Sequence, residues 1–336
     1  MNIVEYIKKE IFGLHRKNFE PMALELFQYQ AKHNPVYREY IKLLGIVPEK
    51  IRKLTHIPFL PIEFFKQQKV ITADAYANSN VQSVMFESSG TTQQVKSKHY
   101  VADVHFYHTV ATQGFSLQYG APGNYHILAL LPSYLERQNA SLVAMIQHFI
   151  QLSNSPYSGF FLHDYEKLIT VLEKLKNSSR KTLLIGVSFA LLDLAEQYSP
   201  DLKNMIVMET GGMKGRRKEM VREELHGILQ QHFNIVSVHS EYGMTELLSQ
   251  AYAQRNGRFS APPWTRFFIR DINDPFYLDN RLRSGGINVI DLANADSCAF
   301  IETQDIGRYH PEEDTFEVLG RIDNTDIRGC NLMLTV

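Results

Sequence analysis

Hydroxyl side chains cluster around one glycine in the stretch FESSGTTQQVKSKHY, residues 86–100. Serine and threonine hydroxyls donate hydrogen bonds, glycine lets the backbone approach an oxyanion, and a nearby lysine adds positive charge. The residues concerned are Ser88, Ser89, Gly90, Thr91, Thr92 and Lys96. The pattern predicts a loop that binds a phosphate group, and the alternative is a polar surface turn. The stretch lacks the G-x-x-x-x-G-K-[ST] spacing, which disfavours a P-loop kinase or GTPase.

Three further clusters could complete a nucleotide site. In HSEYGMTE (239–246), Glu246 lies beside Thr245, and a carboxylate next to a hydroxyl could hold Mg²⁺ against phosphate oxygens. Glu246 could instead cap the N-terminus of a helix. In ETQDIGRY (302–309), Asp305 could accept hydrogen bonds from ribose hydroxyls, and GRIDNTDIRGCN (320–331) puts Arg321 close in sequence to Cys330. Residues after predicted strands are also assigned to nucleotide binding: Gly211, Gly212, Tyr242 and Gly243.

The elements that must position these clusters alternate along the chain. The first sixty-odd residues have helical apolar spacing, and residues 55–68 are expected to run extended because they contain two prolines. Short apolar runs that predict buried strands, each followed by a helix or loop, cover residues 125–132, 182–187, 204–210 and 234–240. Val221, Leu225, Ile228 and Leu229 are expected to share the buried face of one such helix. Beyond about residue 260 short strands dominate. The sequence therefore predicts an α/β core with a β-rich C-terminal part.

Composition excludes several classes of function. The 336 residues include 35 lysines and arginines and 36 aspartates and glutamates, so no net field attracts nucleic acid or a membrane surface. We find no signal peptide and no run of about 18 apolar residues, and therefore expect no membrane span. Two cysteines fit a reducing compartment, which predicts a cytoplasmic protein. Of these, Cys298 is expected to be a core residue.

In this order the four clusters resemble the motifs of the adenylate-forming enzymes, which include the acyl-CoA synthetases. Their S-S-G-T-T-G-x-P-K loop is matched from Ser88 to Lys96 except at Gln93 and Val95, and their Y-G-x-T-E motif is matched in full. Their T-G-D becomes residues 303–305, with Gln304 in the middle, and their G-R-x-D hinge is residues 320–323. The resemblance implies ATP and Mg²⁺ as cofactors. It also implies helices packed on mixed β-sheets in αβαβα layers.

Typical members continue into a mobile C-terminal domain, whereas this sequence ends soon after the hinge, so we expect that full domain to be absent. The short form is similar to the acyl-protein synthetase (LuxE) family of the bacterial fatty acid reductase complex. Residues 130–145 and 328–336 carry this likeness. It implies that Cys330 receives the acyl group. The expected organisation is a helical segment packing on the core (1–70), the adenylate-forming core (71–329) and a tail carrying Cys330 (330–336).

The expected activity is the ATP-dependent conversion of a fatty or other apolar carboxylic acid into its adenylate, followed by transfer to Cys330. The hydroxyl loop, Lys96, Thr245 and Mg²⁺ on Glu246 would stabilise the developing charge. One alternative is a ligase that passes the acyl group to coenzyme A or a carrier protein while Cys330 stays inert. Another is a catalytically silent nucleotide-binding subunit of an acyl-modifying assembly. An acyl reductase or acyltransferase partner is expected, because an acylated protein must unload.

Overall fold

The computed structural model describes residues 2–75, 81–88, 95–131, 139–211 and 220–322. Within these ranges the helices are α1 (Ile3–Glu10), α2 (Arg16–His33), α3 (Pro35–Leu43), α4 (Phe64–Gln67), α5 (Val104–Tyr119), α6 (Ser141–Ser153), α7 (Tyr165–Leu175), α8 (Ser188–Tyr198) and α9 (Arg222–Phe233). The strands are β1 (Leu60–Pro61), β2 (Val84–Glu87), β3 (Lys98–Val101), β4 (Tyr125–Leu130), β5 (Gly159–Phe160), β6 (Lys181–Val187), β7 (Ile206–Thr210), β8 (His239–Tyr242), β9 (Ala251–Ala253), β10 (Thr265–Arg270), β11 (Gly285–Asp291), β12 (Phe300–His310) and β13 (Thr315–Arg321). No helix in these ranges is long and apolar enough to cross a membrane.

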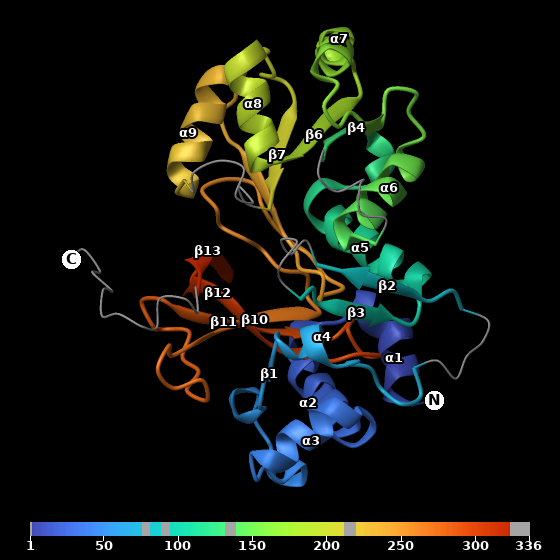
Figure 1. Ribbon diagram of the computed structural model, residues 1–336, viewed down its shortest axis with the longest axis vertical. Helices are drawn as coiled ribbons and strands as arrows, with labels where there is room; N and C mark the ends of the chain where they lie inside the picture. Colours follow the sequence, from blue (N-terminus) through green and yellow to red (C-terminus); the bar gives the residue numbers. More distant parts are fainter. Residues whose placement is uncertain (1, 76–80, 89–94, 132–138, 212–219, 323–336) are drawn as a thin grey trace.

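One sheet occupies the upper part of the molecule (Figure 1) and has the strand order β5-β4-β6-β7-β8-β9. Strands β5 to β8 are parallel, and β9 is antiparallel to β8. Parallel strands are covered on both faces and therefore read as continuous apolar runs; every residue of β4 is buried. Helices α5 and α6 lie on one side of this sheet, and α8 and α9 lie on the other (Figure 1). The predicted alternation of strands and helices is confirmed.

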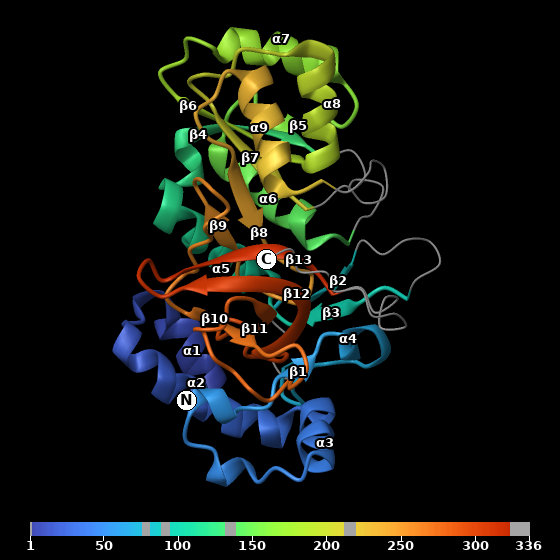
Figure 2. The same cartoon turned by 90° about the vertical axis from the view of Figure 1, so that its left-hand side faces the viewer.

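A second sheet lies in the middle of the molecule (Figure 2) and comes mainly from the C-terminal part of the described chain. Strands β10, β11, β12 and β13 are antiparallel neighbours, and β1 pairs in parallel with the start of β12. The long strand β12 contacts β1 at one end and β13 at the other. The predicted β-rich C-terminal part is confirmed, and Asp305 lies in β12.

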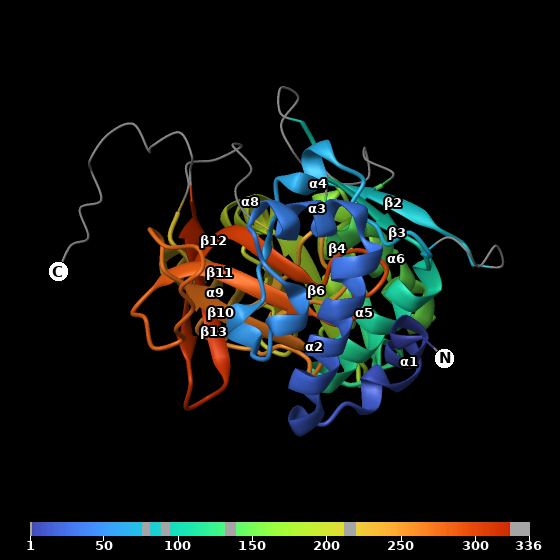
Figure 3. The ribbon, with the colours of Figure 1, turned by 90° about the horizontal axis from the view of Figure 1, so that it is seen from below.

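Helices α2 and α3 lie beneath this second sheet, nearest the viewer in Figure 3. Gln30 of α2 is completely buried. Its amide nitrogen donates to the carbonyl oxygens of Asn294 (3.1 Å) and Ala295 (2.9 Å), and its side-chain oxygen accepts from the backbone nitrogen of Ala299 (2.9 Å). These bonds satisfy the backbone of the turn between β11 and β12, which would otherwise be buried without partners. The N-terminal helices thus fix the shape of that turn.

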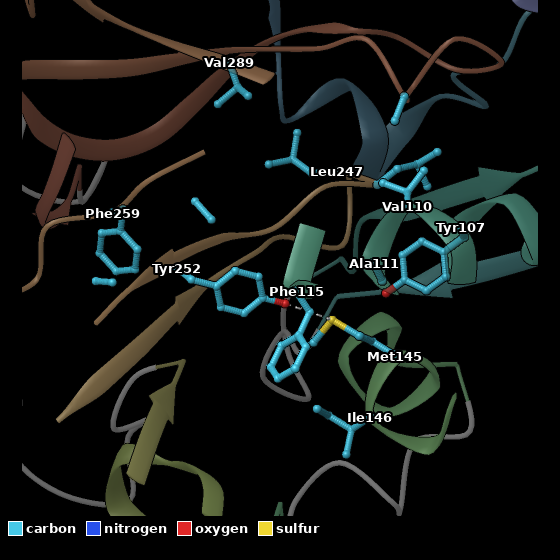
Figure 4. Close-up of a cluster of buried hydrophobic side chains, with 14 of the residues drawn as sticks. Tyr107, Val110, Ala111, Phe115, Met145, Ile146, Leu247, Tyr252, Phe259 and Val289 are labelled. Carbon is cyan, nitrogen blue, oxygen red and sulfur yellow. Dashed lines mark hydrogen bonds between the residues drawn. The ribbon is translucent and has the colours of Figure 1, made fainter. Parts of the chain in front are cut away.

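Apolar side chains from both sheets and the helices form one continuous core. Figure 4 shows the part where Tyr252 of β9 points toward Met145 of α6. Phe115 of α5 lies edge-on to Tyr252, with ring centroids 5.8 Å apart. Burial of each such side chain contributes about 1.5–3 kcal/mol. Because the core joins β9 to α5 and α6, it also fixes the ends of the neighbouring strands.

Three local predictions were wrong. Residues 55–68 are not extended throughout, because only β1 is a strand and α4 follows it at once. Val221 is 65% exposed, since it precedes the first turn of α9 as the N-cap and lies outside the buried face that contains Leu225 and Leu229. Residues 234–238 are not a strand either: Asn234 ends α9 in the left-handed conformation, and β8 begins only at His239.

A stacked histidine pair makes the fold sensitive to acid. His108 of α5 and His148 of α6 stack with centroids 4.3 Å apart. Burial, and then His148, lowers the pKa of His108 from 6.5 to about 4, and burial also lowers the pKa of His148. The unfolded chain therefore binds more protons as pH falls, so this contribution to stability is complete above pH 6.5 and is lost as pH falls toward 4. We expect His148→Phe, which keeps the stack without the charge, to lose less stability between pH 7 and 5 in urea unfolding; equal losses would contradict this.

Candidate active site

The two arms of the hydroxyl-rich loop are β2 and β3, which form an antiparallel hairpin. Where the hairpin opens, the backbone nitrogen of Ser88 donates to the carbonyl oxygen of Ser97 (3.0 Å), and the Ser97 nitrogen donates to Ser88 Oγ (2.9 Å). Lys96 Nζ lies 3.2 Å from Glu87 Oε2 and remains partly exposed. An ammonium paired with one partly exposed carboxylate stays available to a stronger anion. Four predicted loop residues lie outside the described ranges: Ser89, Gly90, Thr91 and Thr92.

Tyr242, Asp305 and Arg321 come from three different strands and meet at one point. The Tyr242 hydroxyl, at the end of β8, donates to Asp305 Oδ2 at 2.7 Å. Asp305 and Arg321 are register partners of β12 and β13, and Arg321 Nε lies 3.7 Å from Asp305 Oδ1. Burial raises the pKa of Asp305, while the Tyr242 hydrogen bond and Arg321 oppose that rise. A carboxylate at this position, held by a phenol and a guanidinium, can accept hydrogen bonds from hydroxyl groups.

Glu246 is the buried acid of the same region, with 4% of its surface exposed. Burial raises the pKa of its carboxyl group; a hydrogen bond from Ser97 and the charge of Arg321 lower it, and Asp305 raises it. These effects place Glu246 within electrostatic reach of both the hairpin of the hydroxyl loop and the Asp305–Arg321 pair. Thr245 precedes it, and the Thr245 carbonyl oxygen is 2.8 Å from His99 Nδ1.

The predicted glycines stand at close approaches of the backbone. Gly211 follows β7 with φ +67°, and its carbonyl oxygen accepts from Ser188 Oγ at 2.9 Å. Gly243 has no room for a side chain, because a Cβ atom there would collide with Glu241 Oε1. Both glycines lie at the carboxyl ends of β7 and β8, where parallel sheets bind ligands. Gly212 lies outside the described residues.

Two buried acids behind these glycines were not predicted from the sequence. Burial raises the pKa of Glu241 to about 7, with Thr210 donating a hydrogen bond that lowers it and Glu209 raising it. Burial also disfavours ionisation of Glu209, but His226 and Arg222 outweigh this and lower its pKa. Glu209 and Glu241 lie in the adjacent strands β7 and β8, where their register partners are Ser240 and Thr210, and spacing along the sequence does not indicate that the two acids are neighbours.

The structure brings together several of the predicted site residues that it describes, whereas Gly211 contacts Ser188 at the end of β7. Ser88 and Lys96 lie at the hairpin, where Ser88 accepts a hydrogen bond from Ser97, the residue whose hydroxyl lowers the pKa of Glu246. Tyr242, Asp305 and Arg321 form the second half of the same region, and Thr245 and Gly243 lie in the segment between them. Cys330 is outside the described residues.

Cys298 is completely buried, and burial raises the pKa of its thiol to about 12. A thiol attacks as its thiolate, so Cys298 is poorly suited to act as a nucleophile, which agrees with its predicted place in the core. We expect Cys298 in the Cys330→Ser variant to resist iodoacetamide at pH 8 and to react once the protein is unfolded in urea, as followed by mass spectrometry. Rapid labelling of the folded variant would contradict its assignment to the core.

Three polar residues that hold the site were missed: Ser97, His99 and Asn294. Ser97 lies just before β3 and His99 lies within it, and their spacing of two residues along an extended segment was a usable signal that both face the same way. Asn294 lies 195 residues from His99 in the sequence, and no local pattern indicates their contact at 3.0 Å.

Solved structures share this fold. MatB of Rhodopseudomonas palustris with bound ATP matches with a TM-score of 0.50 at 14% identity, over 70% of this chain and 47% of that chain. A long-chain-fatty-acid–CoA ligase, FadD1 of Archaeoglobus fulgidus, matches with a TM-score of 0.51 at 14% identity, over 71% and 51%. The chain thus spans about half the length of these structures. The fold, with helices on mixed sheets, is that of the adenylate-forming enzymes.

Sequence comparison gives the family. The acyl-protein synthetase (LuxE) family model matches residues 13–336, and the chain belongs to that family. A curated relative, the long-chain-fatty-acid–luciferin-component ligase of Aliivibrio fischeri, is 24% identical over 341 residues, which cover 94% of this chain and 87% of the relative. The family and fold expected from the sequence motifs are confirmed.

Proposed function

We propose that this protein uses ATP to activate a fatty or other apolar carboxylic acid as an acyl-adenylate, and that the acyl group then passes to Cys330. The observation that carries the proposal is the meeting of Tyr242, Asp305 and Arg321 beside Glu246. A paired acceptor for hydroxyls, a cation and a second carboxylate are the groups that a magnesium nucleotide requires. The name of the Aliivibrio fischeri relative supports a long-chain fatty acid as the substrate.

Each described residue has a role in this proposal. Asp305 accepts from the ribose hydroxyls, and the Tyr242 hydroxyl keeps the carboxylate in place. Lys96 exchanges its contact with Glu87 for a contact with a phosphate oxygen. Arg321, beside Asp305, adds a second positive charge. Gly211 and Gly243 let the nucleotide approach the ends of β7 and β8. Ser88 and the loop residues that follow it donate to the phosphates, and Gly212 extends the glycine contact.

Glu246 fits a magnesium site. It is a buried carboxylate whose pKa is raised mainly by burial, so a divalent cation would stabilise its ionised form. Among the described residues no group of three or more His, Cys, Asp and Glu side chains could hold a metal alone, so the phosphates must supply further ligands. Mg²⁺ bound there would neutralise phosphate charge, and Thr245 would orient its hydroxyl toward the same oxygens.

The proposed chemistry proceeds in two transfers. An oxygen of the substrate carboxylate attacks the α-phosphorus of ATP, forming one P–O bond, while the bond to the β-phosphate oxygen breaks and pyrophosphate leaves. The thiolate of Cys330 then attacks the acyl carbon, a thioester forms, and AMP leaves with the electrons of the broken C–O bond. The residues around the nucleotide accelerate the first transfer by alignment and by stabilising the oxyanions that develop.

Family membership also bears on the partner of this protein and on its cellular compartment. A thioester on the protein needs an acceptor, and we propose an acyl reductase or acyltransferase. We place the protein in the cytoplasm, in line with its cysteine content. The division into a helical segment (1–70), a core (71–329) and a tail (330–336) remains a proposal.

Two measurements test the proposal: exchange of labelled pyrophosphate into ATP, and transfer of a labelled acid to the protein in the presence of ATP. We expect acid-dependent exchange of pyrophosphate into ATP, and label on the protein that hydroxylamine removes. No exchange with any acid tried would overturn the proposal in favour of a nucleotide-binding subunit. Label that appears on coenzyme A or a carrier protein, and never on the protein itself, would overturn the second transfer and assign a ligase with Cys330 inert.

A further inference from the structure

Two side chains of the arm that contains β3 lie near the Thr245–Glu246 segment: Ser97 just before the strand and His99 within it. The Ser97 hydroxyl lowers the pKa of the Glu246 carboxyl group, and two residues later His99 Nδ1 lies 2.8 Å from the Thr245 carbonyl oxygen. Both side chains belong to the arm that follows the hydroxyl loop. The position of that arm is therefore coupled to the position of Thr245 and Glu246.

Asn294 completes this contact from the turn between β11 and β12. Its Nδ2 donates to the carbonyl oxygens of Glu246 (2.8 Å) and Cys298 (3.0 Å), and its Oδ1 lies 3.0 Å from His99 Nε2. His99 and Asn294 are both almost completely buried. Two consecutive backbone carbonyls, those of Thr245 and Glu246, are thus held by side chains from two other elements.

The His99 ring faces an oxygen acceptor on each side. Because Asn294 Nδ2 is committed to two carbonyls, the orientation of the amide is fixed and Oδ1 must face the ring. Burial lowers the pKa of His99 to about 4, although both hydrogen bonds oppose this, so the ring is neutral at pH 7. A neutral imidazole has one N–H, which can go to Thr245 or to Asn294. The shorter contact is the one to Thr245.

We propose that His99 is a positioning residue for nucleotide activation: by donating to the Thr245 carbonyl it keeps the Thr245 hydroxyl and the Glu246 carboxylate aligned with the arm of the hydroxyl loop. Asn294 holds the next carbonyl, that of Glu246. The inference rests on the proposed function for what the aligned groups bind. It predicts that His99 affects magnesium nucleotide more than the carboxylic acid.

Three substitutions separate the parts of this arrangement. His99→Phe keeps a ring, which can pack edge-on against Phe65 as His99 does at 5.7 Å, but loses the N–H that donates to Thr245. His99→Asn places an amide N–H near the position of Nδ1 and can still donate to Thr245, whereas His99→Gln reaches the position of Nε2. The matched control is His126→Phe. His126, the second residue of β4, also contacts two groups, Ser155 Oγ (2.6 Å) and Ser178 Oγ (3.1 Å).

Two readouts test the variants. In acid-dependent pyrophosphate exchange we expect His99→Phe to raise KM for MgATP and lower kcat, by about 10-fold together, and to leave KM for the acid near the wild-type value. His99→Asn should recover more activity than His99→Gln. Fluorescence of Trp264, the one tryptophan of the chain, reports MgATP binding without turnover, because its Nε1 donates to Ser249 Oγ (2.9 Å) in the segment after Glu246.

The outcomes are distinct. Wild-type kinetic constants in His99→Phe, or equal increases in both KM values matched by His126→Phe, would overturn the positioning role. If His99→Asn recovers no more activity than His99→Gln, the assignment of the His99 N–H to the Thr245 carbonyl is overturned. If the wild-type protein catalyses no exchange, the proposed function fails, and the Trp264 titration alone then decides whether His99 positions a nucleotide site: unchanged MgATP affinity in His99→Phe would overturn it.

Discussion

Replacement of Cys330 by serine is expected to abolish hydroxylamine-sensitive acylation of the protein while acid-dependent pyrophosphate exchange stays within about twofold of the wild-type rate, because the thiol enters only the second transfer. Labelled fatty acid, ATP and gel autoradiography measure the first quantity, and isotope exchange measures the second. Serine is close in size to cysteine but does not ionise near neutral pH, so it removes the nucleophile with little change in shape.

Cys298→Ala is the matched control for this experiment. Its thiol is buried and donates weakly to the carbonyl oxygen of Phe300 at 3.5 Å, so the substitution should affect stability and leave labelling intact. Persistent label in Cys330→Ser together with loss of label in Cys298→Ala would reverse the assignment of the two cysteines. Persistent label in both single variants would exclude a thioester on either residue alone.

Substitution of Glu246 by glutamine should have the largest effect on activation itself. Loss of the proposed magnesium carboxylate is expected to lower the exchange rate by about 100- to 1000-fold, as for other groups that stabilise developing charge. Stability should move in the opposite direction. Because burial raises the pKa of Glu246, ionisation is costly in the unliganded protein, and a neutral amide of the same size should leave the unfolding temperature unchanged or higher.

Glu317→Gln provides a comparison outside the site. Glu317 is largely buried and pairs with Arg258 (3.2 Å) and His310 (3.1 Å), so losing its charge should lower stability with little effect on exchange. A Glu246→Gln protein that unfolds at lower temperature and retains its exchange activity would mean that Glu246 serves the fold. The proposed role of the acid in binding magnesium would then be abandoned.

The sequence predicts the site best at the residues of the family motifs. Tyr242 ends β8 and Asp305 lies in β12, so their residue types and the family order indicated a common ligand before their contact was known. The contacts of His99 with Thr245 and Asn294 were beyond reach, because the residues are 146 and 195 positions apart and each looks ordinary in its own segment. The prediction for Val221 was wrong because the apolar spacing of α9 extends one residue before the helix begins at Arg222.

Gln304 illustrates how tertiary contacts accommodate a departure from a motif. The residue replaces the central glycine of T-G-D and lies in β12 without positive φ, where the pairing with β11 shifts its register between Glu302 and Ile306. Its amide donates to Glu63, next to α4, and its carbonyl oxygen accepts from the backbone nitrogen of Ile322 at 2.6 Å. The side chain has a partner on a neighbouring element, so Asp305 keeps its position without a glycine before it.

The three hydrogen bonds between Gln30 and the β11–β12 turn limit which segments of this protein can be exchanged with those of a relative. Since the same turn presents Asn294 to His99, the helix that carries Gln30 acts at a distance on the loop around Thr245. Hybrids that exchange residues 1–70 with those of a relative should therefore be built with the turn from the same parent. A hybrid whose residues 1–70 and β11–β12 turn come from different parents should bind the nucleotide more weakly. This is expected although no residue of 1–70 contacts the nucleotide in the proposed site.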